Sequence, residues 1–300
     1  MAEMVRFNLY AIKTIRQLRP SVVHLVLIQR SLIPLYLWLW TQRSLRVVVT
    51  MALSHLAYRS RVSLSTRATA WIMWQRADAI DSLYPAFVTA AGRRYRRKIT
   101  VSPCSFTDTE AFRPAEQKDN VIVFSGRLID EKNPLLLLRA LISLKDMAPQ
   151  MLRDWRVHIL GEGPLERDVR ERIVQAGLEG LVTVERVHCT SPYLRRARIF
   201  VSLQKTENYP SQSLLEAMSS GCAVIATDVG QTRRLIDEET GLLVPSDSPS
   251  ELAEALLSLM VDPKRCDALG RAARERVLAE HSLARFAEYL GQLWRRSGCC

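Results

Sequence analysis

From residue 121 onward, the chain alternates short apolar runs with longer segments of mixed polarity. Apolar runs of about five residues are typical of strands buried on both faces of a sheet. We expect strands near 121–125, 156–160, 181–184, 199–203, 222–226 and 241–244. The helical segments expected between and after them are 135–144, 165–175, 249–260, 263–280 and 282–296. Strands that alternate with helices indicate a parallel sheet covered on both faces.

The first hundred residues show a less regular alternation. Apolar residues at helical spacing, from Phe7 to Leu18, predict an amphipathic helix over residues 3–19. Strands are expected at Val22–Ile28, Arg46–Thr50 and Ile99–Ser102, and helices at Ala68–Ala77 and Pro85–Arg93. The stretch Cys104–Pro114 is expected to link two domains. No glycine occurs before Gly92.

A polar segment from Thr206 to Gly221 lies between two of the predicted strands. It carries two carboxylates, Glu207 and Glu216, on either side of an expected helix start. A helix start offers unpaired backbone N–H groups and the positive end of the helix dipole, which together favour an anion. Carboxylates beside that anion are suited to accept hydrogen bonds from the hydroxyl groups of a ribose or a sugar. The segment therefore favours a sugar nucleotide.

A purely structural interpretation of the same segment stays open. Ser213 and Glu216 fit a capping box, in which Ser213 caps the helix and Glu216 bonds back to the Ser213 N–H. Glu207 would then be a solvated loop charge.

Two cations follow the predicted strand at 121–125. Arg127 and Lys132 lie in the loop after Gly126, and Asn133-Pro134 begins the next helix. Ligands of parallel α/β sheets bind beyond the carboxyl ends of the strands, where this loop falls. The planar fork of an Arg and the mobile charge of a Lys suit a diphosphate, although a basic surface loop would have the same sequence.

These segments together resemble the large family of retaining glycosyltransferases with the GT-B fold, the group 1 type that uses nucleotide-sugar donors. The resemblance is close over residues 95–295 and loose over residues 20–95. It implies an α/β protein with two Rossmann-like parallel-sheet domains facing a cleft, the N-terminal one incomplete. The implied parts are an acceptor-side domain at 1–114, a donor-binding domain at 115–281 and a returning helix at 282–300.

The family opens with a strand and a glycine-rich loop, whereas this chain opens with a helix. We therefore expect the first βα units to be missing, through a short gene product, a wrongly assigned start or divergence. The family's N-terminal domain often supplies an active-site histidine. His55, which follows the predicted strand Arg46–Thr50, is the nearest candidate, although its position favours an ordinary loop or helix histidine.

The resemblance also implies roles for the phosphate-side residues. Arg127 and Lys132 match the family's Arg-x4-Lys pair, which contacts the donor phosphates. Gly161, Gly163 and Pro164 match its Gly-x-Gly-Pro turn. Without a third glycine at the dinucleotide spacing, this turn alone is a weak nucleotide signal.

Glu207 and Glu216 resemble the family's Glu pair, whose first member contacts the donor sugar and whose second contacts the ribose. Eight residues rather than the family's seven separate them here. The resemblance assigns catalysis to Arg127, Lys132 and Glu207. The expected donor-binding residues are Gly126, Arg127, Lys132, Gly163, Glu207, Tyr209, Pro210, Ser211, Gln212, Ser213, Leu214 and Glu216.

Charge is unevenly distributed along the chain. The 300 residues carry a formal net charge of +11. Residues 1–100 hold 16 Lys and Arg against 3 Asp and Glu, whereas the remaining residues hold 26 against 28. A basic first third favours an anionic membrane surface or an acidic glycan as a partner. Nucleic acid is disfavoured because the region has no zinc-ligand spacing and no aromatic-glycine RNA-binding pattern.

The apolar run Ser31–Trp40 lies within this basic region. It is too short and too interrupted by Pro34 to span a membrane, which takes about 20 apolar residues. Tyr36, Trp38 and Trp40 suit insertion at a membrane interface, and a helix buried against a sheet has the same composition. With no signal-peptide pattern at the start, we expect a cytoplasmic protein, with attachment to the inner face of the membrane as an open alternative.

Six cysteines show neither a disulfide framework nor a metal-binding spacing, so no metal and no other cofactor is expected. The predicted function is transfer of a sugar from a nucleotide-sugar donor to a glycan or lipid-linked acceptor, with retention. Two alternatives stay open: a catalytically impaired nucleotide-binding relic of the same fold, and a nucleotide-sugar epimerase.

Overall fold

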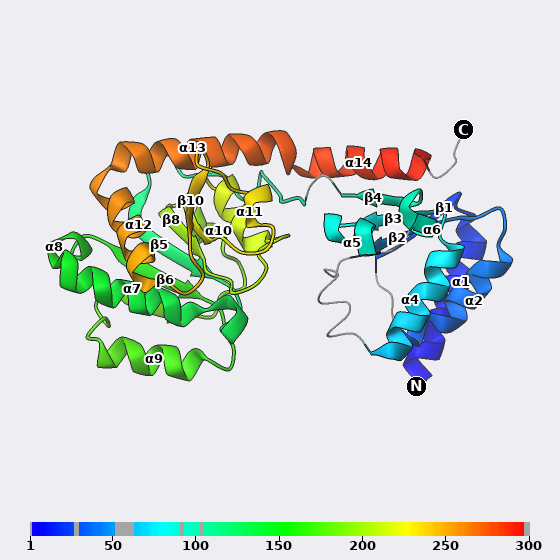
Figure 1. The fold of residues 1–300 in the computed structure, drawn as a ribbon, viewed down its shortest axis with the longest axis horizontal. Coiled ribbons are helices and arrows are strands. Elements are labelled where there is room, and N and C mark those ends of the chain that lie inside the picture. Colours follow the sequence, from blue (N-terminus) through cyan, green and yellow to red (C-terminus); the bar gives the residue numbers. More distant parts are fainter. Residues whose placement is uncertain (1, 27–29, 52–62, 91–92, 103–104, 297–300) are drawn as a thin grey trace. The chain divides into compact units, whose positions relative to one another are not determined.

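The structure, a computed structural model, describes residues 2–26, 30–51, 63–90, 93–102 and 105–296. The chain forms two compact units (Figure 1). Unit 1 comprises residues 1–104 and 287–300, and unit 2 comprises residues 105–286. Within the described ranges, unit 1 contains a four-stranded sheet and unit 2 a six-stranded sheet, both parallel. The α/β class with two parallel sheets is therefore confirmed.

The sheet of unit 2 contains all the strands predicted beyond residue 120. The strands are β5 (Asp119–Ser125), β6 (Arg156–Leu160), β7 (Val182–Glu185), β8 (Ala197–Ser202), β9 (Ala223–Thr227) and β10 (Gly241–Val244). Their order in the sheet is β10-β9-β8-β5-β6-β7. The chain therefore builds the sheet in one direction from β5 to β7 and in the other from β8 to β10, so the direction reverses between β5 and β8.

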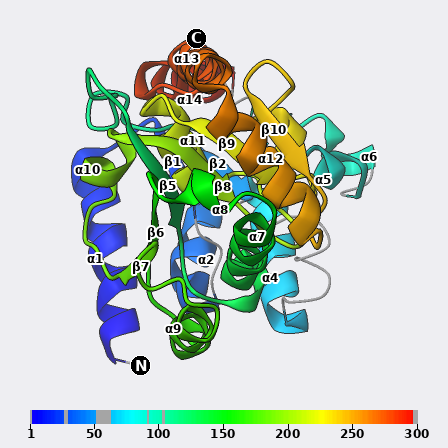
Figure 2. The ribbon, with the colours of Figure 1, turned by 90° about the vertical axis from the view of Figure 1, so that its left-hand side faces the viewer.

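Helices cover this sheet and complete its core. They are η2 (Asp130–Lys132), α7 (Pro134–Met147), α8 (Pro149–Leu152), α9 (Glu166–Gln175), α10 (Ser191–Leu194), α11 (Gln212–Ser219), η3 (Thr232–Arg234), α12 (Pro249–Val261), α13 (Pro263–Glu280) and the first residues of α14 (Leu283–Arg296). Proline occupies the start of α7, α12 and α13, where its missing N–H is not needed. Helices α7 and α12 lie side by side and share one core with α9 and the sheet (Figure 2).

Unit 1 has the strand order β1-β2-β3-β4. The strands are β1 (Val22–Leu25), β2 (Arg46–Met51), β3 (Ala79–Ser82) and β4 (Ile99–Val101). The helices are α1 (Ala2–Leu18), η1 (Arg30–Leu32), α2 (Ile33–Thr41), α4 (Leu64–Arg76), α5 (Pro85–Ala90) and α6 (Arg93–Arg96). The sequence pattern did not predict β3, because Asp81 interrupts the apolar run that marks a buried strand.

Both faces of the unit 1 sheet are covered. On β2, Val47 and Val49 join the core formed with helices α2 and α4, whereas Val48 packs against Leu293 of α14. Successive side chains of a strand point to opposite faces, so α14 covers the face opposite to α2 and α4. The end of the chain that the structure describes is thus part of the core of unit 1.

A row of polar side chains crosses the sheet beneath α14. His24 Nε2 lies 2.7 Å from Thr50 Oγ1, which donates to Asp81 Oδ2 at 3.0 Å. Tyr289 and Trp294 of α14 donate to Asp81 Oδ1 at 2.5 Å and to His24 Nδ1 at 3.3 Å. Burial raises the pKa of Asp81 and lowers the pKa of His24, so burial disfavours the charged form of each.

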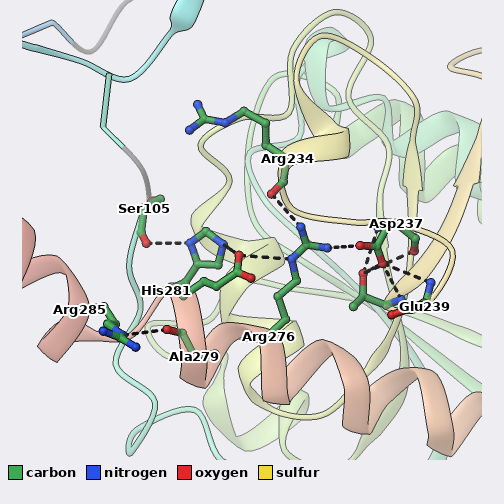
Figure 3. A network of polar contacts seen from close by, with 10 residues as sticks. Ser105, Arg234, Asp237, Glu239, Arg276, Ala279, His281 and Arg285 are labelled. Atoms are coloured by element: carbon green, nitrogen blue, oxygen red, sulfur yellow. Dashed lines mark hydrogen bonds and ion pairs between the residues drawn. The ribbon is translucent and has the colours of Figure 1, made fainter. Parts of the chain in front are cut away.

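The stretch expected to link two domains belongs largely to unit 2. His281, at the end of α13, donates from Nδ1 to the Ser105 carbonyl oxygen at 3.0 Å (Figure 3). Phe106 stacks on Phe286 with ring centroids 4.3 Å apart. Burial lowers the pKa of His281, which favours the neutral ring. The expected domain limits at residues 114 and 281 stay predictions.

Candidate functional site

The predicted site residues of unit 2 gather at the carboxyl ends of β5 and β8. These strands are neighbours, and the strand order reverses between them. Loops that follow such strands run in opposite directions and leave a crevice, which is where ligands of this fold class bind. Gly126 and Arg127 follow β5 directly, and Glu207 follows β8 in the loop that leads to α11.

The glycine turn after β6 holds the loop after β5. The Leu128 N–H donates to the Glu162 carbonyl oxygen at 2.8 Å. A Cβ on Gly161 would lie 1.9 Å from the carbonyl oxygen of Gly126, and a Cβ on Gly163 would lie 2.4 Å from that of Leu128. Side chains are therefore excluded at both positions, because the two backbones approach each other too closely.

Arg127 and Lys132 lie on this braced loop. The methylene groups of Lys132 lie 3.8–3.9 Å from where a Cβ on Gly126 would stand, so the Lys stem covers that glycine. Burial, followed by the charge of Arg127, lowers the pKa of Lys132, although Glu131 opposes the shift. Neither cation forms a hydrogen bond or an ion pair with any residue that the structure describes. Two neighbouring cations without a bonded anion are suited to bind a diphosphate.

The carboxylates of η2 tie this loop to the one after β8. Asp130 pairs with Lys205 Nζ at 2.5 Å. The Glu131 carboxylate accepts the Thr206 N–H at 3.2 Å and the Thr206 hydroxyl at 2.5 Å. Asp130 and Glu131 are therefore paired with Lys205 and Thr206, and neither forms an ion pair with Lys132.

Glu207 is fixed by backbone N–H groups from two loops. Its Oε1 accepts from Asn208 at 3.0 Å, from Tyr209 at 3.0 Å and from Gln231, in the loop after β9, at 2.9 Å. No described residue donates a hydrogen bond to Oε2. The carboxylate thus keeps one oxygen for a ligand.

Three of the predicted donor-binding residues, Tyr209, Ser211 and Leu214, have buried side chains. Tyr209 is 2% exposed and Leu214 is 0% exposed, so only their backbone atoms can reach a ligand. The Arg234 guanidinium lies 4.1 Å from the centroid of the Tyr209 ring, a cation–π distance. Tyr209 therefore anchors the loop rather than presenting its ring to the donor. Pro210 connects this anchored residue to the start of α11.

Helix α11 begins with three unpaired backbone N–H groups. Ser211 is the N-cap residue and makes no side-chain capping bond. The Leu215 N–H is the first to bond back, to the Ser211 carbonyl oxygen at 3.1 Å. The N–H groups of Gln212, Ser213 and Leu214 have no acceptor among the described residues, so they offer an anion site.

The structure places Glu216 one turn into α11 and shows that the predicted capping box is wrong. Ser213 is the second helical residue rather than the N-cap. Glu216 instead accepts hydrogen bonds from the Thr190 hydroxyl, at 3.3 Å to Oε2, and from the Gln212 side chain. Burial raises the pKa of Glu216, partly opposed by these two bonds. A half-buried carboxylate held in this way can accept a hydroxyl of a ribose.

Other parts of unit 2 offer weaker candidate sites. In the described ranges, no three His, Cys, Asp or Glu side chains lie close enough to share a metal ion. A cavity of about 480 Å³ is lined by Pro114, Ala115, Glu116, Gln117, Lys118, Arg198, Gly221, Asp267, Arg271 and Arg274. It lies at the amino ends of the strands, and Lys118 and Arg274 there donate to backbone carbonyls. Both cations therefore bind carbonyl groups at the carboxyl end of α11.

The membrane-facing residues predicted in unit 1 are partly engaged in its core. Tyr36 is fully buried and Trp38 is half-buried beneath Arg16, so α2 packs against its neighbours. Of the three predicted aromatic residues, Trp40 is the exposed one. Lys98 donates to the carbonyl oxygen of Ala77 at 2.7 Å, beside the end of α4. No helix in the parts of the chain that the structure describes has the length and apolar character needed to cross a membrane.

His55 lies outside the described residues. The residues that sequence reasoning missed are Gly230 and Gln231, which contact Glu207 from the loop after β9. The available signal was a glycine four residues after the predicted strand 222–226.

The profile of the family "glycosyl transferases group 1" matches residues 106–276, which is more than half of the chain. The chain belongs to this family. The lipopolysaccharide core biosynthesis mannosyltransferase LpsB of Rhizobium meliloti (strain 1021) is 30% identical over 178 residues, which are 55% of this chain and 49% of LpsB. A D-inositol 3-phosphate glycosyltransferase of Pseudarthrobacter chlorophenolicus is 32% identical over 181 residues, 56% of this chain and 42% of that protein. The chain thus spans about half the length of the curated relatives it matches.

Solved structures of glycosyltransferases share the fold. Anabaena HepE in complex with UDP is 15% identical and has a TM-score of 0.79 over 96% of this chain and 82% of HepE. A glycosyltransferase from Rickettsia africae is 16% identical, with a TM-score of 0.74 over 98% of this chain and 81% of that chain. At these identities the likeness concerns the fold alone, and the predicted GT-B-like fold is confirmed.

Proposed function

We propose that this protein is a glycosyltransferase that moves a sugar from a nucleotide-sugar donor to a glycan or lipid-linked acceptor, with retention. The observation that carries the proposal is the pair of cations Arg127 and Lys132. They have no bonded partner in the described ranges, and their loop is tied to the one that leads into the open N-terminus of α11. We assign donor binding to unit 2 and acceptor binding to unit 1.

In this proposal the phosphates of the donor bind the two cations and the free N–H groups of α11. Negative charge develops on the departing diphosphate as the bond to the sugar breaks. Arg127 and Lys132 stabilise that charge, and they act without a metal ion because their own charges face the phosphates. Because the loops are braced by backbone bonds, these charges are in place before the reaction begins.

The two carboxylates bind the two polyols of the donor. Glu216 accepts hydrogen bonds from the ribose, and the free Oε2 of Glu207 accepts one from a sugar hydroxyl. Support comes from the different surroundings of the two carboxylates. Among the residues that the structure describes, Glu216 accepts hydrogen bonds from side chains, whereas Glu207 is fixed by backbone N–H groups. The family relatives include a mannosyltransferase and an N-acetylgalactosaminyltransferase, which is consistent with several sugars.

We further propose that unit 1 rests on an anionic membrane surface that presents a lipid-linked acceptor. The first hundred residues carry a large excess of positive charge. Phe7 and Tyr10 of α1, Leu37 and Trp40 of α2 and Trp71 of α4 are exposed apolar side chains. Binding to vesicles containing phosphatidylglycerol should weaken as salt rises, because the attraction decays over about 8 Å at physiological salt. Equal binding to neutral vesicles would contradict this part of the proposal.

A panel of nucleoside diphosphates and their sugars tests the function. UDP, GDP, ADP, UDP-glucose, UDP-N-acetylglucosamine and GDP-mannose are compared by thermal unfolding and by isothermal titration calorimetry. A ligand at 100 times its dissociation constant should stabilise unit 2 by about 2.7 kcal/mol. Absence of binding by every nucleotide would overturn the proposal. The donor that binds would then be tested for transfer to membrane extracts that contain lipid-linked glycans.

A further inference from the structure

The loop after β9 contacts Glu207 from a part of the chain distant in sequence. The Gln231 N–H donates to Glu207 Oε1 at 2.9 Å, beside the two N–H groups from the Glu207 loop itself. Gly230 has a left-handed backbone, with φ of 54°. A Cβ on Gly230 would lie 2.5 Å from Oε1, 2.6 Å from Cδ and 2.7 Å from Oε2 of Glu207. The carboxylate therefore occupies the space that any side chain at position 230 would need.

The same loop is anchored on its other side by α13. Arg276 pairs with Asp237 at 2.6 Å, and its second terminal nitrogen lies 3.5 Å from the carbonyl oxygen of Arg234 (Figure 3). Asp237 also accepts the hydroxyl of Thr240 at 2.8 Å. The side chain of Arg234 in turn stacks on Tyr209, two residues beyond Glu207. The segment from 230 to 240 is thus held between a long helix and the Glu207 loop.

We infer that the segment 230–237 is a positioning element for Glu207, with Gly230 and Gln231 as the positioning residues. This inference rests on the proposed function, because it assumes that Glu207 binds the donor sugar. Three N–H groups occupy Oε1 and prevent rotation of the carboxylate, so Oε2 points to one place. An oxygen fixed in this way recognises a hydroxyl at one position of the sugar ring, whereas a mobile carboxylate would accept several.

The first test compares two glycine substitutions that impose the same backbone strain. Gly230→Ala places a methyl group against the Glu207 carboxylate and displaces it. Gly177→Ala is the matched control, because Gly177 also has a left-handed backbone, with φ of 60°, and its Cβ would meet only the end of the Lys145 side chain at 3.2 Å. Both variants are titrated with UDP and UDP-glucose, or with the pair from the nucleotide panel that binds best.

The expected result is a loss confined to the sugar. Gly230→Ala should lose roughly 10- to 150-fold in affinity for the nucleotide sugar, the range for one hydrogen bond to a charged group, and keep its affinity for the nucleoside diphosphate. Gly177→Ala should keep both affinities. Equal losses for both ligands, or no loss for either, would overturn the inference while the wild type still bound nucleotide. If the wild type bound no nucleotide, the proposed function would fail instead.

Two further measurements test the inference, and the second of them needs no ligand. In a double-mutant cycle, Gly230→Ala should add little to the effect of Glu207→Gln, because both act through one carboxylate. Additive effects would show that Gly230 acts elsewhere. Amide hydrogen exchange of Gln231 should quicken in Glu207→Ala, because its acceptor is then removed. An unchanged exchange rate in that variant would rule out the positioning contact without any nucleotide.

Discussion

Replacing Lys132 by methionine separates its role in ligand binding from any role in stability. The substitution keeps the apolar stem that covers Gly126 and removes only the charge. That charge is half-buried, lies near the charge of Arg127 and forms no ion pair in the described parts of the chain. Its removal relieves a desolvation cost and a like-charge repulsion, so the free energy of unfolding should stay the same or rise slightly.

The cost should appear in nucleotide binding instead. A hydrogen bond to a charged group contributes about 1.5–3 kcal/mol, which corresponds to a 10- to 150-fold rise in the dissociation constant of a nucleoside diphosphate. Isothermal titration calorimetry at constant ionic strength measures this constant, and urea unfolding measures the stability. Lys145→Met is the control, because Lys145 donates to the Ala176 and Gly177 carbonyls at the end of α9. It should lose about 1 kcal/mol of stability at most and no affinity.

Two results would refute this reasoning. An unchanged dissociation constant in Lys132→Met would mean that the phosphates bind elsewhere. A drop in stability of more than about 1 kcal/mol would mean that the ammonium group has a structural partner. The second result would also remove the observation that carries the proposed function.

Other predictions concern pH and close packing. Because burial raises the pKa of Glu216 above its ordinary 4.5, nucleotide affinity should fall as pH is lowered through that raised value, and Glu216→Gln should lose this component in calorimetric titrations. Equal pH profiles would contradict ribose binding by the carboxylate. Because burial lowers the pKa of His281, the unfolded state binds the proton more tightly, so stability should fall as pH drops below about 6.5. His281→Asn should flatten that fall in urea unfolding between pH 7.5 and 5.5. Gly161→Ala should cost more than about 2 kcal/mol, whereas Gly180→Ala, which meets nothing within 4 Å, should cost far less in the same assay.

Local sequence pattern was sufficient for most of unit 2, because its strands are uninterrupted apolar runs. It failed at β3, where Asp81 occupies a buried position that becomes favourable only through Tyr289, far along the chain. It also misplaced the start of α11. The pattern of Ser213 and Glu216 fits a capping box, but Ser211 has the extended backbone of an N-cap and the helix starts after it.

For the candidate site, the sequence pattern predicted that Arg127 and Lys132 follow the strand β5 and that Glu216 lies just beyond a helix start, and the structure places them there. Their roles in binding stay predictions. The sequence pattern could not predict the partners of Glu207, because the Gln231 N–H belongs to the loop after a different strand, β9. Every residue except proline has a backbone N–H, so the residue type does not indicate which N–H makes a contact. Gly230, next to Gln231, was the one local feature of the sequence that indicated this contact.

The division of unit 1 between the two ends of the chain has a consequence for its synthesis. Residues 1–104 lack the cover of one sheet face until residues 287–296 have been made. At ordinary rates of translation that interval lasts on the order of 10 to 40 s, whereas unit 2 is contiguous and can fold as it emerges. During that time Val48 and the polar row beside it face solvent on a growing chain. The strong positive charge of this region favours repulsion between nascent chains, which we expect to disfavour their aggregation until α14 has been made.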